Sequence, residues 1–338
     1  MGMKAAIFEE KNRVIIKDVE VPAPGPDEIL LSVVSAGLCG TDYHIFKGDS
    51  AVSSPLIMGH EIAGRVVDIG EDVSGWQQGQ AVAVDPNIYC GHCSFCRQGR
   101  VNLCENLQAV GVTRDGGFAE YTVVPADNLY PLAGDIDIVM ASLVEPLACC
   151  LHGIELLNIE PGSRVLILGG GPIGLILAQL TKLRGAGRVV ISEPVAAKRE
   201  LAGELDLKET VAPDELTAYT RQEIPQGFDI VIEAAGRAET VARSFDLVCR
   251  GGSILLFGVC PEKLEVPLSP YKIFKNELTV KGSYINPFVS KKAVNILEKN
   301  MIGLQPLISE RISLQELPGV LAGKASTAKM KTVVLPGE

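Results

Sequence analysis

The pattern of hydrophobic and polar positions changes character near residue 160. Before that point, short runs of β-branched and aliphatic residues, separated by Gly, Pro and Asp, predict strands at 29–35, 62–69 and 81–84. After it, apolar strands alternate with helical stretches, the strands at 164–169, 188–193, 228–233 and 253–258 and the helices at 172–184, 195–205 and 240–249. Such alternation is typical of a parallel sheet covered by helices on both faces. The chain is therefore predicted to be an α/β protein whose first part is rich in β structure.

Beyond about residue 286 the alternation weakens. A helical stretch at 290–299 is followed by strands near 307–312 and 331–335. This tail is too short to be a domain by itself, so we expect it to pack on the N-terminal β domain. The prediction is a discontinuous domain of residues 1–150 and 287–338 and a second domain of residues 151–286. A chain of 338 residues is long enough for two separate cores.

Composition and charge exclude several classes of protein. The chain is 47% hydrophobic with 35 glycines, which suits an α/β fold with many tight turns. Its net charge of -10 gives it no electrostatic attraction to nucleic acid or anionic lipid. It shows neither an apolar run of membrane-spanning length nor the apolar core of a secretory signal. We therefore expect a cytoplasmic protein with no nucleic-acid or membrane partner.

A glycine turn joins the predicted strand at 164–169 to the following helix. Gly169, Gly171 and Gly174 have the G-x-G-x-x-G spacing, which permits a tight turn, close approach of a pyrophosphate and close packing of helix on strand. The helix N-terminus offers free N–H groups to phosphate. The residues predicted to contact the cofactor here are Gly169, Gly171, Pro172, Ile173 and Gly174. The motif predicts dinucleotide binding.

Glu193 ends the next predicted strand, 19 residues after Gly174. A carboxylate at this position can bind the adenosine ribose hydroxyls and repel the extra phosphate of NADP. Lys198 and Arg199 lie nearby, and Arg199 is a further candidate for cofactor contact. We predict NAD as the cofactor and leave the strictness of its selection over NADP open.

Four of the nine cysteines crowd into fifteen residues, as Cys90, Cys93, Cys96 and Cys104. Four thiolates fill a tetrahedral zinc shell and leave no position for water, which is the mark of a structural site. The surrounding segment, residues 86–108, is polar and rich in Gly and Asn, so a metal must organise it. The spacing predicts a structural zinc lobe.

A second, dispersed set of residues has chemistry suited to a metal. Cys39-Gly-Thr41-Asp-Tyr-His44 follows a strand, Gly59-His60-Glu61 opens another, and Glu145-Pro146 comes just before the change of pattern. Cys, His and carboxylate are zinc ligands, and three of them plus water form a catalytic site. Spacing alone does not connect these motifs, because a His beside a Glu is more often a structural pair and Cys39 alone would rank as a buried thiol.

These motifs together resemble the zinc-containing medium-chain dehydrogenase/reductase family over essentially the whole chain. The matching segments are Cys39–His44, Gly59–Gly64, the four-cysteine loop, Gly116–Tyr121, Glu145-Pro146 and the glycine turn. The segments Glu145-Pro-Leu-Ala-Cys and Ile273-Phe-Lys-Asn-Glu-Leu are most similar to the polyol branch, which contains sorbitol, xylitol and arabinitol dehydrogenases.

The resemblance implies a GroES-like catalytic domain, a doubly wound Rossmann domain and a cleft between them. It places Cys39 and His60 on a catalytic zinc, with Glu145 where many alcohol dehydrogenases carry a second cysteine. Glu61 is an alternative or exchanging ligand, and the choice between Glu61, Glu145 and water for the remaining position stays open. Two zinc ions per subunit are thus expected, one catalytic and one structural.

The implied reaction is transfer of a hydride from a secondary alcohol to NAD, giving a ketone. In this resemblance the zinc acidifies the substrate hydroxyl, and its proton leaves through Thr41 and the nicotinamide ribose to His44. Glu61 and Glu145 are counted with Thr41 and His44 among the catalytic residues.

The implied substrate is a polyol, and the resemblance leaves its identity open. After Lys281-Gly282 the chain reads Ser-Tyr-Ile-Asn-Pro-Phe, without the arginine that sorbitol dehydrogenases place nearby, so sorbitol is no better supported than arabinitol or xylitol. The alternatives are a threonine, butanediol or sugar-alcohol-phosphate dehydrogenase and, from another class, a non-catalytic zinc and nucleotide-binding protein. Family members are commonly homodimers or homotetramers, which we expect here too.

Overall fold

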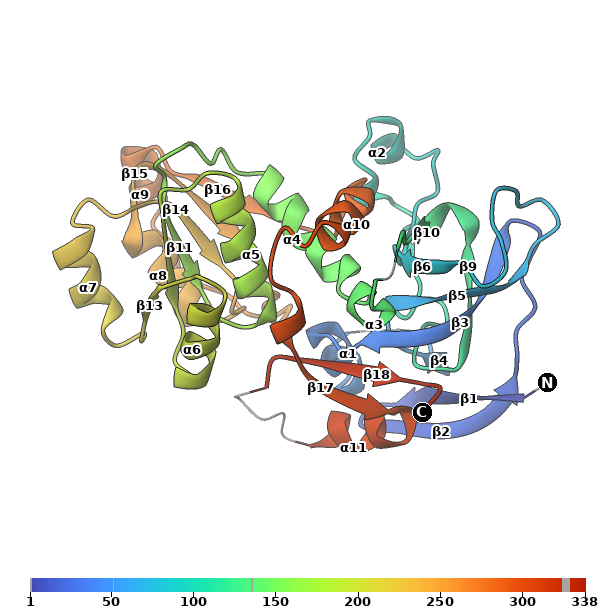
Figure 1. Ribbon diagram of the computed structural model, residues 1–338. Coiled ribbons are helices and arrows are strands. Elements are labelled where there is room, and N and C mark those ends of the chain that lie inside the picture. The colour runs from blue at the N-terminus through green and yellow to red at the C-terminus, as the bar shows by residue number, and fades with distance from the viewer. Residues whose placement is uncertain (1, 51, 135, 324–328) are drawn as a thin grey trace. The chain divides into compact units, whose positions relative to one another are not determined.

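The computed structural model describes residues 2–50, 52–134, 136–323 and 329–338, and it divides into two compact units (Figure 1). Unit 1 comprises residues 1–148 and 286–338, and unit 2 comprises residues 149–285. The predicted α/β class is confirmed, because unit 1 is built mainly from β-sheets and unit 2 from a parallel sheet with helices. None of the helices in the described ranges is long and apolar enough to cross a membrane.

Unit 2 contains a six-stranded sheet in the order β13-β12-β11-β14-β15-β16, with every neighbouring pair parallel. The strands are β11 (Arg164–Leu168), β12 (Arg188–Ser192), β13 (Glu209–Val211), β14 (Phe228–Glu233), β15 (Val248–Leu256) and β16 (Thr279–Gly282). The central strands are nearly continuous runs of Val, Ile and Leu because both of their faces are buried. The chain reverses its direction of winding between β11 and β14, which is where such sheets bind ligands.

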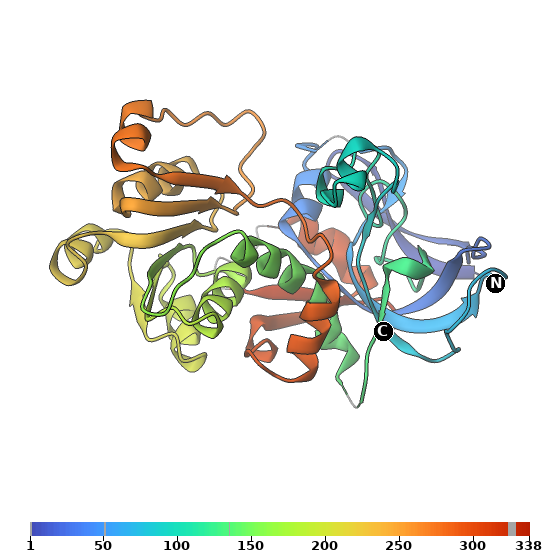
Figure 2. The same cartoon turned by 90° about the horizontal axis from the view of Figure 1, so that it is seen from above.

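The helices of unit 2 cover both faces of this sheet. They are α5 (Pro172–Leu183), α6 (Ala196–Glu204), α7 (Leu216–Glu223), α8 (Ala238–Leu247) and α9 (Pro270–Asn276). α5 and α6 lie on one face, and α8 and α9 lie on the other (Figures 1 and 2). The helix expected at 240–249 begins and ends two residues earlier, and the strand expected at 253–258 is the second half of the longer β15. β13, α7, α9 and β16 had not been predicted, because each is short or exposed and gives little periodic signal.

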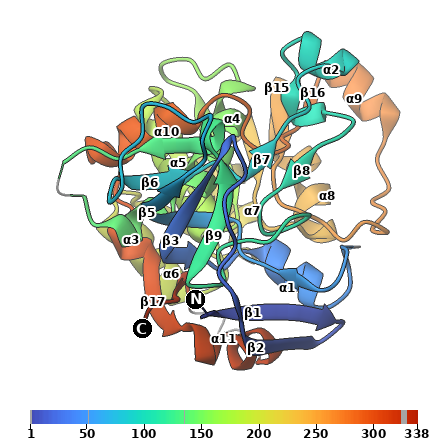
Figure 3. The same ribbon diagram turned by 90° about the vertical axis from the view of Figure 1, so that its right-hand side faces the viewer.

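Unit 1 is built around a seven-stranded sheet in the order β10-β6-β5-β3-β18-β17, with β9 also paired to β3. Its strands are β3 (Glu28–Gly37), β5 (Glu61–Ile69), β6 (Ala81–Val84), β9 (Tyr121–Pro125), β10 (Leu129–Pro131), β17 (Ile308–Ser313) and β18 (Lys331–Leu335). A second sheet contains β1 (Gly2–Glu10), β2 (Arg13–Glu20) and β4 (Leu56–Ile57), and β7 (Asn87–Ile88) pairs with β8 (Gln108–Ala109) (Figure 3). β18 pairs antiparallel with β3, so the last strand of the chain completes the first domain's sheet.

Short helices join the strands of unit 1. They are α1 (Gly40–Phe46), α2 (Ser94–Arg97), α3 (Ile138–Ala141), α10 (Ser290–Glu298) and α11 (Leu317–Ala322), with 3-10 turns at Val101–Leu103, Ala126–Asn128, Gln305–Leu307 and Leu314–Glu316. α4 (Val144–Glu155) begins in unit 1 and ends in unit 2.

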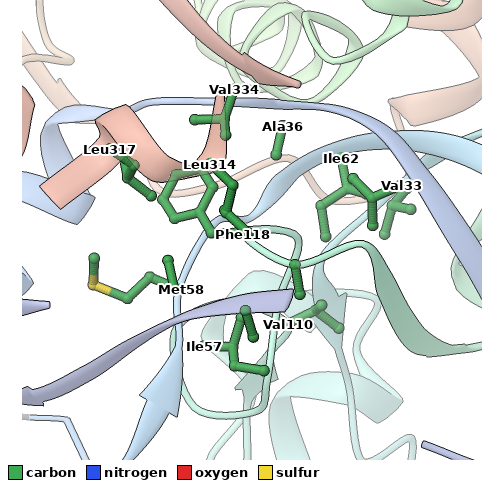
Figure 4. Packing of buried hydrophobic residues seen from close by; sticks show 14 of the residues in the cluster. Val33, Ala36, Ile57, Met58, Ile62, Val110, Phe118, Leu314, Leu317 and Val334 are labelled. Carbon is green, nitrogen blue, oxygen red and sulfur yellow. The ribbon is translucent and has the colours of Figure 1, made fainter. Parts of the chain in front are cut away.

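The core of unit 1 is made by both ends of the chain. Phe118 is fully buried and packs with Met58 from the N-terminal part and with Leu314 and Val334 from the C-terminal part (Figure 4). Truncating a buried Phe or Leu in such a core typically costs about 2–5 kcal/mol. The C-terminal segment is therefore part of the folding unit that contains the first β-strands.

A buried polar network joins the same two parts of the chain. Asn87 Nδ2 donates to Asn286 Oδ1 (2.6 Å), and Ser290 Oγ donates to Asp85 Oδ2 (2.8 Å). All four residues are at most 5% exposed. Burial raises the pKa of Asp85, although the hydrogen bonds from Ser290 and Asn87 oppose the rise. Buried polar groups that satisfy one another in this way fix a single arrangement of the elements that carry them.

Candidate functional site

The four cysteines of the predicted structural site meet in a small lobe of unit 1 formed by β7, α2 and β8 (Figure 3). The Sγ atoms of Cys90, Cys93, Cys96 and Cys104 all lie within 4.8 Å of one another, and Cys90 and Cys96 are 4.0 Å apart. With Zn–S bonds of about 2.3 Å, the sulfurs of a tetrahedral site would be about 3.8 Å apart. The observed cluster is close to this geometry.

Backbone N–H groups of the lobe point at the sulfur atoms. Cys93 N donates to Cys90 Sγ (3.4 Å), and Cys96 N donates to Cys93 Sγ (3.5 Å). Backbone donors at His92 and Cys93 lower the pKa of Cys90 to about 6. The pKa of Cys93 is lowered too, whereas burial and the neighbouring cysteines raise the pKa of Cys96 to about 12, so the lobe favours the metal-binding thiolate form at Cys90 and Cys93.

A second cluster gathers Cys39, His60 and Glu61, whose ligand atoms also lie within 4.8 Å of one another. The pairing of β3 with β5 places Gly37 opposite Glu61, so the residues that follow β3 meet those that open β5. A Cβ atom at Gly37 would lie 1.9 Å from Glu61 Oε2, so a larger residue at position 37 would displace this carboxylate. The pairing explains why spacing along the chain did not reveal the cluster.

Asp42 organises this cluster from within α1. Its Oδ2 accepts a hydrogen bond from Cys39 N (2.8 Å), and its Oδ1 lies 3.7 Å from His60 Nδ1. Burial lowers the pKa of His60, but the charges of Asp42 and Cys39 outweigh burial and place that pKa well above its ordinary value. Asp42 was not predicted as a site residue, although its position three residues after Cys39, at the start of a helix, is a recognisable capping position.

Lys331 is a second residue of this centre that was not predicted from the sequence. Its Nζ donates to Glu61 Oε1 (2.6 Å) and to Leu38 O (3.2 Å), and the residue is only 5% exposed. Burial lowers the pKa of Lys331, but the nearby Glu61, Cys39 and Glu145 raise it by more. The pKa of Lys331 therefore lies above the ordinary value of a lysine. The signal available in the sequence was a single charged residue opening the apolar strand Lys-Thr-Val-Val-Leu.

The other predicted catalytic residues lie at different distances from the cluster. Glu145 is 8% exposed in the first turn of α4 and close enough to affect Lys331 electrostatically, but it is not one of the three clustered ligands. Thr41 Oγ1 lies 3.9 Å from Cys39 Sγ. The His44 side chain is 30% exposed, with Nδ1 3.6 Å from Asp49 Oδ2.

The chemistry of the second cluster fits zinc. Glu61 Oε2, His60 Nδ1 and Asp42 Oδ1 are buried and have no hydrogen-bond partner among the described residues. Buried polar atoms are rarely left unsatisfied, and here a cation would satisfy Glu61 Oε2 directly, while His60 Nδ1 and Asp42 Oδ1 face each other at 3.7 Å. Thiolate, imidazole and carboxylate are the donor set of catalytic zinc sites, which keep one position open.

The predicted glycine turn lies at the carboxyl end of β11 in unit 2. A Cβ at Gly174 would lie 1.9 Å from Gly169 O, so helix α5 packs against the turn as closely as only glycine allows. Nothing lies within 4 Å of the position that a Cβ of Gly171 would take, so the turn is open where a pyrophosphate would approach. α5 begins at Pro172, followed by Ile173, and directs its first N–H groups to this space. The turn therefore fits a dinucleotide.

Glu193 lies directly after β12 and is 5% exposed. Its Oε2 accepts a hydrogen bond from Gly170 N (2.8 Å) and its Oε1 accepts one from Val195 N (2.9 Å). Arg199 Nη1 donates to Glu193 O (2.7 Å) and to Pro194 O (2.9 Å). The carboxylate thus links the glycine turn to the loop after β12, and the guanidinium lies beside it.

Comparison with known proteins agrees with this geometry. The profile of the alcohol dehydrogenase GroES-like domain matches residues 25–134, and that of the zinc-binding dehydrogenases matches residues 172–299. The chain is 36% identical to D-arabinitol dehydrogenase 1 of Uromyces fabae, over 99% of this chain and 97% of that protein. It is 37% identical to D-altritol 5-dehydrogenase of Agrobacterium fabrum, over 97% of this chain and 98% of that protein.

A solved structure is also similar to this chain over nearly its whole length. It is a zinc-binding dehydrogenase from Sinorhizobium meliloti 1021 with NADP bound, 42% identical, with a TM-score of 0.96 over 99% of this chain and all of that one. The predicted resemblance and fold class are confirmed by these relatives. The protein is an alcohol dehydrogenase-type oxidoreductase with zinc and a nicotinamide dinucleotide as cofactors. The chain belongs to the zinc-containing medium-chain dehydrogenase/reductase family and is similar within it to the polyol dehydrogenases.

Proposed function

We propose that this protein oxidises a secondary hydroxyl group of a polyol, such as arabinitol, xylitol or sorbitol, to a ketone with NAD as the acceptor. The observation that carries the proposal is the convergence of Cys39, His60 and Glu61 at one buried point of unit 1. The names of the arabinitol and altritol dehydrogenases among its relatives support a polyol as the substrate.

Cys39, His60 and a carboxylate would hold the catalytic zinc, which supplies Lewis-acid polarisation of the substrate oxygen. Lys331 binds Glu61 Oε1, so Oε2 is the oxygen of Glu61 left for the metal. Glu145 is the other candidate carboxylate, since its charge already reaches the same centre. Either one, or water, would complete the zinc shell.

Thr41 and His44 would carry the proton away. The Thr41 hydroxyl lies beside the ligand Cys39 and would accept the proton from the substrate hydroxyl while it gives up its own proton toward His44. His44 lies three residues further along α1 and is partly exposed, so it can pass the proton to water. Replacing His44 with Gln should change the pH dependence of kcat/KM, whereas an unchanged profile would contradict this route.

NAD rather than NADP is the proposed acceptor. The buried Glu193 carboxylate lies at the end of β12, where the ribose phosphate of NADP would bring a second negative charge. Arg199 is the residue that could offset this repulsion, but its guanidinium is held by two backbone carbonyls. The zinc-binding dehydrogenase from Sinorhizobium meliloti has NADP bound, so both cofactors need to be compared.

Cys90, Cys93, Cys96 and Cys104 would hold a second, structural zinc. Four sulfur ligands leave no open position for substrate.

We further propose a homodimer or homotetramer formed through the edge strand β16, next to α9 (orange in Figure 2). All four residues of β16 are exposed, and Val280, Tyr271 and Phe274 form an apolar margin around it. A second copy of the strand can pair with it antiparallel; sedimentation velocity of the wild type and of Val280→Pro tests this.

A cytoplasmic location is part of the proposal. Five of the cysteines, Cys39, Cys90, Cys93, Cys96 and Cys104, are proposed metal ligands, and ligand cysteines must be reduced, which suits a reducing compartment.

The test of the main proposal is NADH formation with C4–C6 polyols, simple secondary alcohols, threonine, butanediol and sugar-alcohol phosphates. NADP is run in parallel, and each reaction is repeated after treatment with a zinc chelator. We expect turnover with a polyol and NAD that the chelator abolishes and added zinc restores. Turnover confined to threonine or a phosphorylated substrate would replace the polyol, and no turnover with any substrate would favour a binding protein.

A further inference from the structure

Glu233 is a completely buried carboxylate at the carboxyl end of β14, and the proposed reaction does not use it. Its Oε1 accepts hydrogen bonds from Ala235 N (2.9 Å), Gly236 N (2.9 Å) and Thr240 Oγ1 (2.6 Å). One side chain thus fixes the turn after β14 and joins it to the first turn of α8.

The turn that Glu233 holds lies against the glycine turn of the cofactor site. Gly169 has a φ of 112°, and a Cβ there would lie 3.2 Å from the carbonyl carbon of Ala234 and from Ala235 N. A shift of the turn after β14 would therefore meet Gly169 directly.

Glu233 also fixes the chain after β15. Its backbone oxygen accepts hydrogen bonds from Phe257 N and Gly258 N, both at 2.9 Å. A Cβ at Gly258 would lie 2.6 Å from Glu233 Oε2 and 2.3 Å from Gly236 N. The loops that end β14 and β15 are therefore packed on this one residue as closely as glycine allows.

The other oxygen of the carboxylate makes stability a poor explanation for this residue. Oε2 is buried and has no hydrogen-bond partner among the described residues. Burying a carboxylate oxygen without a partner opposes folding, and the three donors at Oε1 need only that one oxygen as their acceptor. A buried polar atom of this kind calls for an explanation, and a role at a binding site is one.

The position of Glu233 identifies that site. A dinucleotide binds across the point where the strand order reverses, between β11 and β14. Glu193 lies on the β12 side of β11, where the adenosine half belongs, so the other half faces the carboxyl ends of β14 and β15. We propose that Glu233 is a positioning residue for the nicotinamide half of the cofactor, acting through the loops Ala234–Gly236 and Phe257–Gly258.

This inference rests on the nicotinamide cofactor and not on the identity of the alcohol. It predicts that loss of Glu233 weakens binding of the whole dinucleotide but not of ADP-ribose, which lacks the nicotinamide. A residue that only supported the fold of unit 2 would affect both ligands alike.

The test is calorimetric titration of the zinc-loaded, full-length protein with NADH and with ADP-ribose. Glu233→Ala is expected to raise the Kd of NADH about tenfold or more, since hydrogen bonds to a charged group are lost, and to leave that of ADP-ribose within about twofold. Glu233→Gln keeps an acceptor at Oε1 and should restore most of the NADH affinity. Glu239→Ala, which removes an exposed carboxylate in the first turn of α8, is the matched control.

Thr240→Val removes one donor to Glu233 Oε1 and keeps the test valid if the alanine variant does not fold. Like Glu233→Ala, Thr240→Val should raise the Kd of NADH relative to that of ADP-ribose, but by a smaller factor. Equal weakening of NADH and ADP-ribose, or no weakening of either, would overturn the role of Glu233. Failure of the wild type to bind NADH while it binds ADP-ribose would overturn the cofactor assignment as well.

Discussion

At the scale of single residues, Lys331 and Glu61 form a buried ion pair in unit 1. Its two charged atoms are 2.6 Å apart, and the side chains are 6% and 0% exposed. Together with Cys39 and Glu145, the pair determines the local charge around the proposed cation site. Removing either residue leaves the charge of the other buried and unpaired. This destabilises the fold, because the interior offers no water to replace the lost partner.

Lys331→Met is therefore expected to lower the free energy of unfolding by about 3–5 kcal/mol, since it leaves the Glu61 charge buried and unpaired. Urea unfolding of the metal-free protein measures this loss. The double variant Lys331→Met with Glu61→Gln should recover most of it. Lys329→Met, which breaks the exposed pair with Glu310, should cost about 1 kcal/mol or less. Equal losses for the two lysines would contradict the importance of the buried pair.

Glu193 has a second task besides selecting the cofactor. Because it holds Gly170 N and Val195 N, Glu193→Ala should loosen the glycine turn and weaken NADH and NADPH together, each by about tenfold. Fluorescence titration with both cofactors measures this, with the exposed Glu200 changed to Ala as the control. A variant that lost NADH affinity but gained NADPH affinity would show that the carboxylate acts only by repulsion.

At the scale of elements, the four-cysteine lobe depends on its metal more than on its packing. β7 and β8 are two residues each, and α2 has four residues with none of them buried. Cys104→Ser should remove one of two zinc equivalents and lower the melting temperature. Metal analysis and thermal unfolding test this, and Cys260→Ser, outside either cluster, should change neither. Two zinc equivalents in the folded Cys104→Ser protein would refute the site.

β11 and β14 are joined at their amino ends by an ion pair. Arg164 donates from its backbone N (2.8 Å) and from Nε (2.9 Å) to Asp229 Oδ2. The Arg164 side chain lowers the pKa of Asp229 to about 2. An acid whose pKa is lower in the folded than in the unfolded chain stabilises the fold above its ordinary pKa, near 4, and stops doing so as the pH falls to the lowered value.

Asp229→Asn should therefore reduce stability at pH 7, and its difference from the wild type should shrink between about pH 4 and pH 2. Urea unfolding at a series of pH values gives this difference directly, and loss of zinc in acid affects both proteins alike. A difference that stays constant through this range would exclude the proposed linkage.

At the scale of the whole molecule, each unit has a core of its own. We expect urea to unfold the protein in two transitions, because the metal clusters lie in unit 1 and the glycine turn lies in unit 2. A chelator should lower the midpoint of one transition, and NADH should raise the midpoint of the other. Fluorescence and circular dichroism would follow them; a single transition that both ligands shift would show that the units unfold together.

The sequence predicted the fold where its signals are local or periodic. The strand, glycine turn and helix at residues 164–183 and the four cysteines were recognised because each lies within one short segment. The centre formed by Cys39, His60 and Glu61 required the family resemblance, because the register of β3 against β5 creates it. Lys331 and Glu233 were missed because their roles depend on burial beside distant residues, which no spacing along the chain encodes.

The return of the C-terminal segment to the first β domain has a consequence for how the protein is made. A ribosome releases the chain from its N-terminus, so unit 2 is complete before residues 286–338 have been synthesised. Until then β3 lacks its neighbour β18, and Glu61 lacks the lysine that neutralises it. An unfinished or C-terminally clipped product would carry the nucleotide fold without an intact metal centre. Synthesis of the last strand is therefore expected to be needed for oxidation of the alcohol, whereas an aborted chain that folds unit 2 would still carry the dinucleotide site.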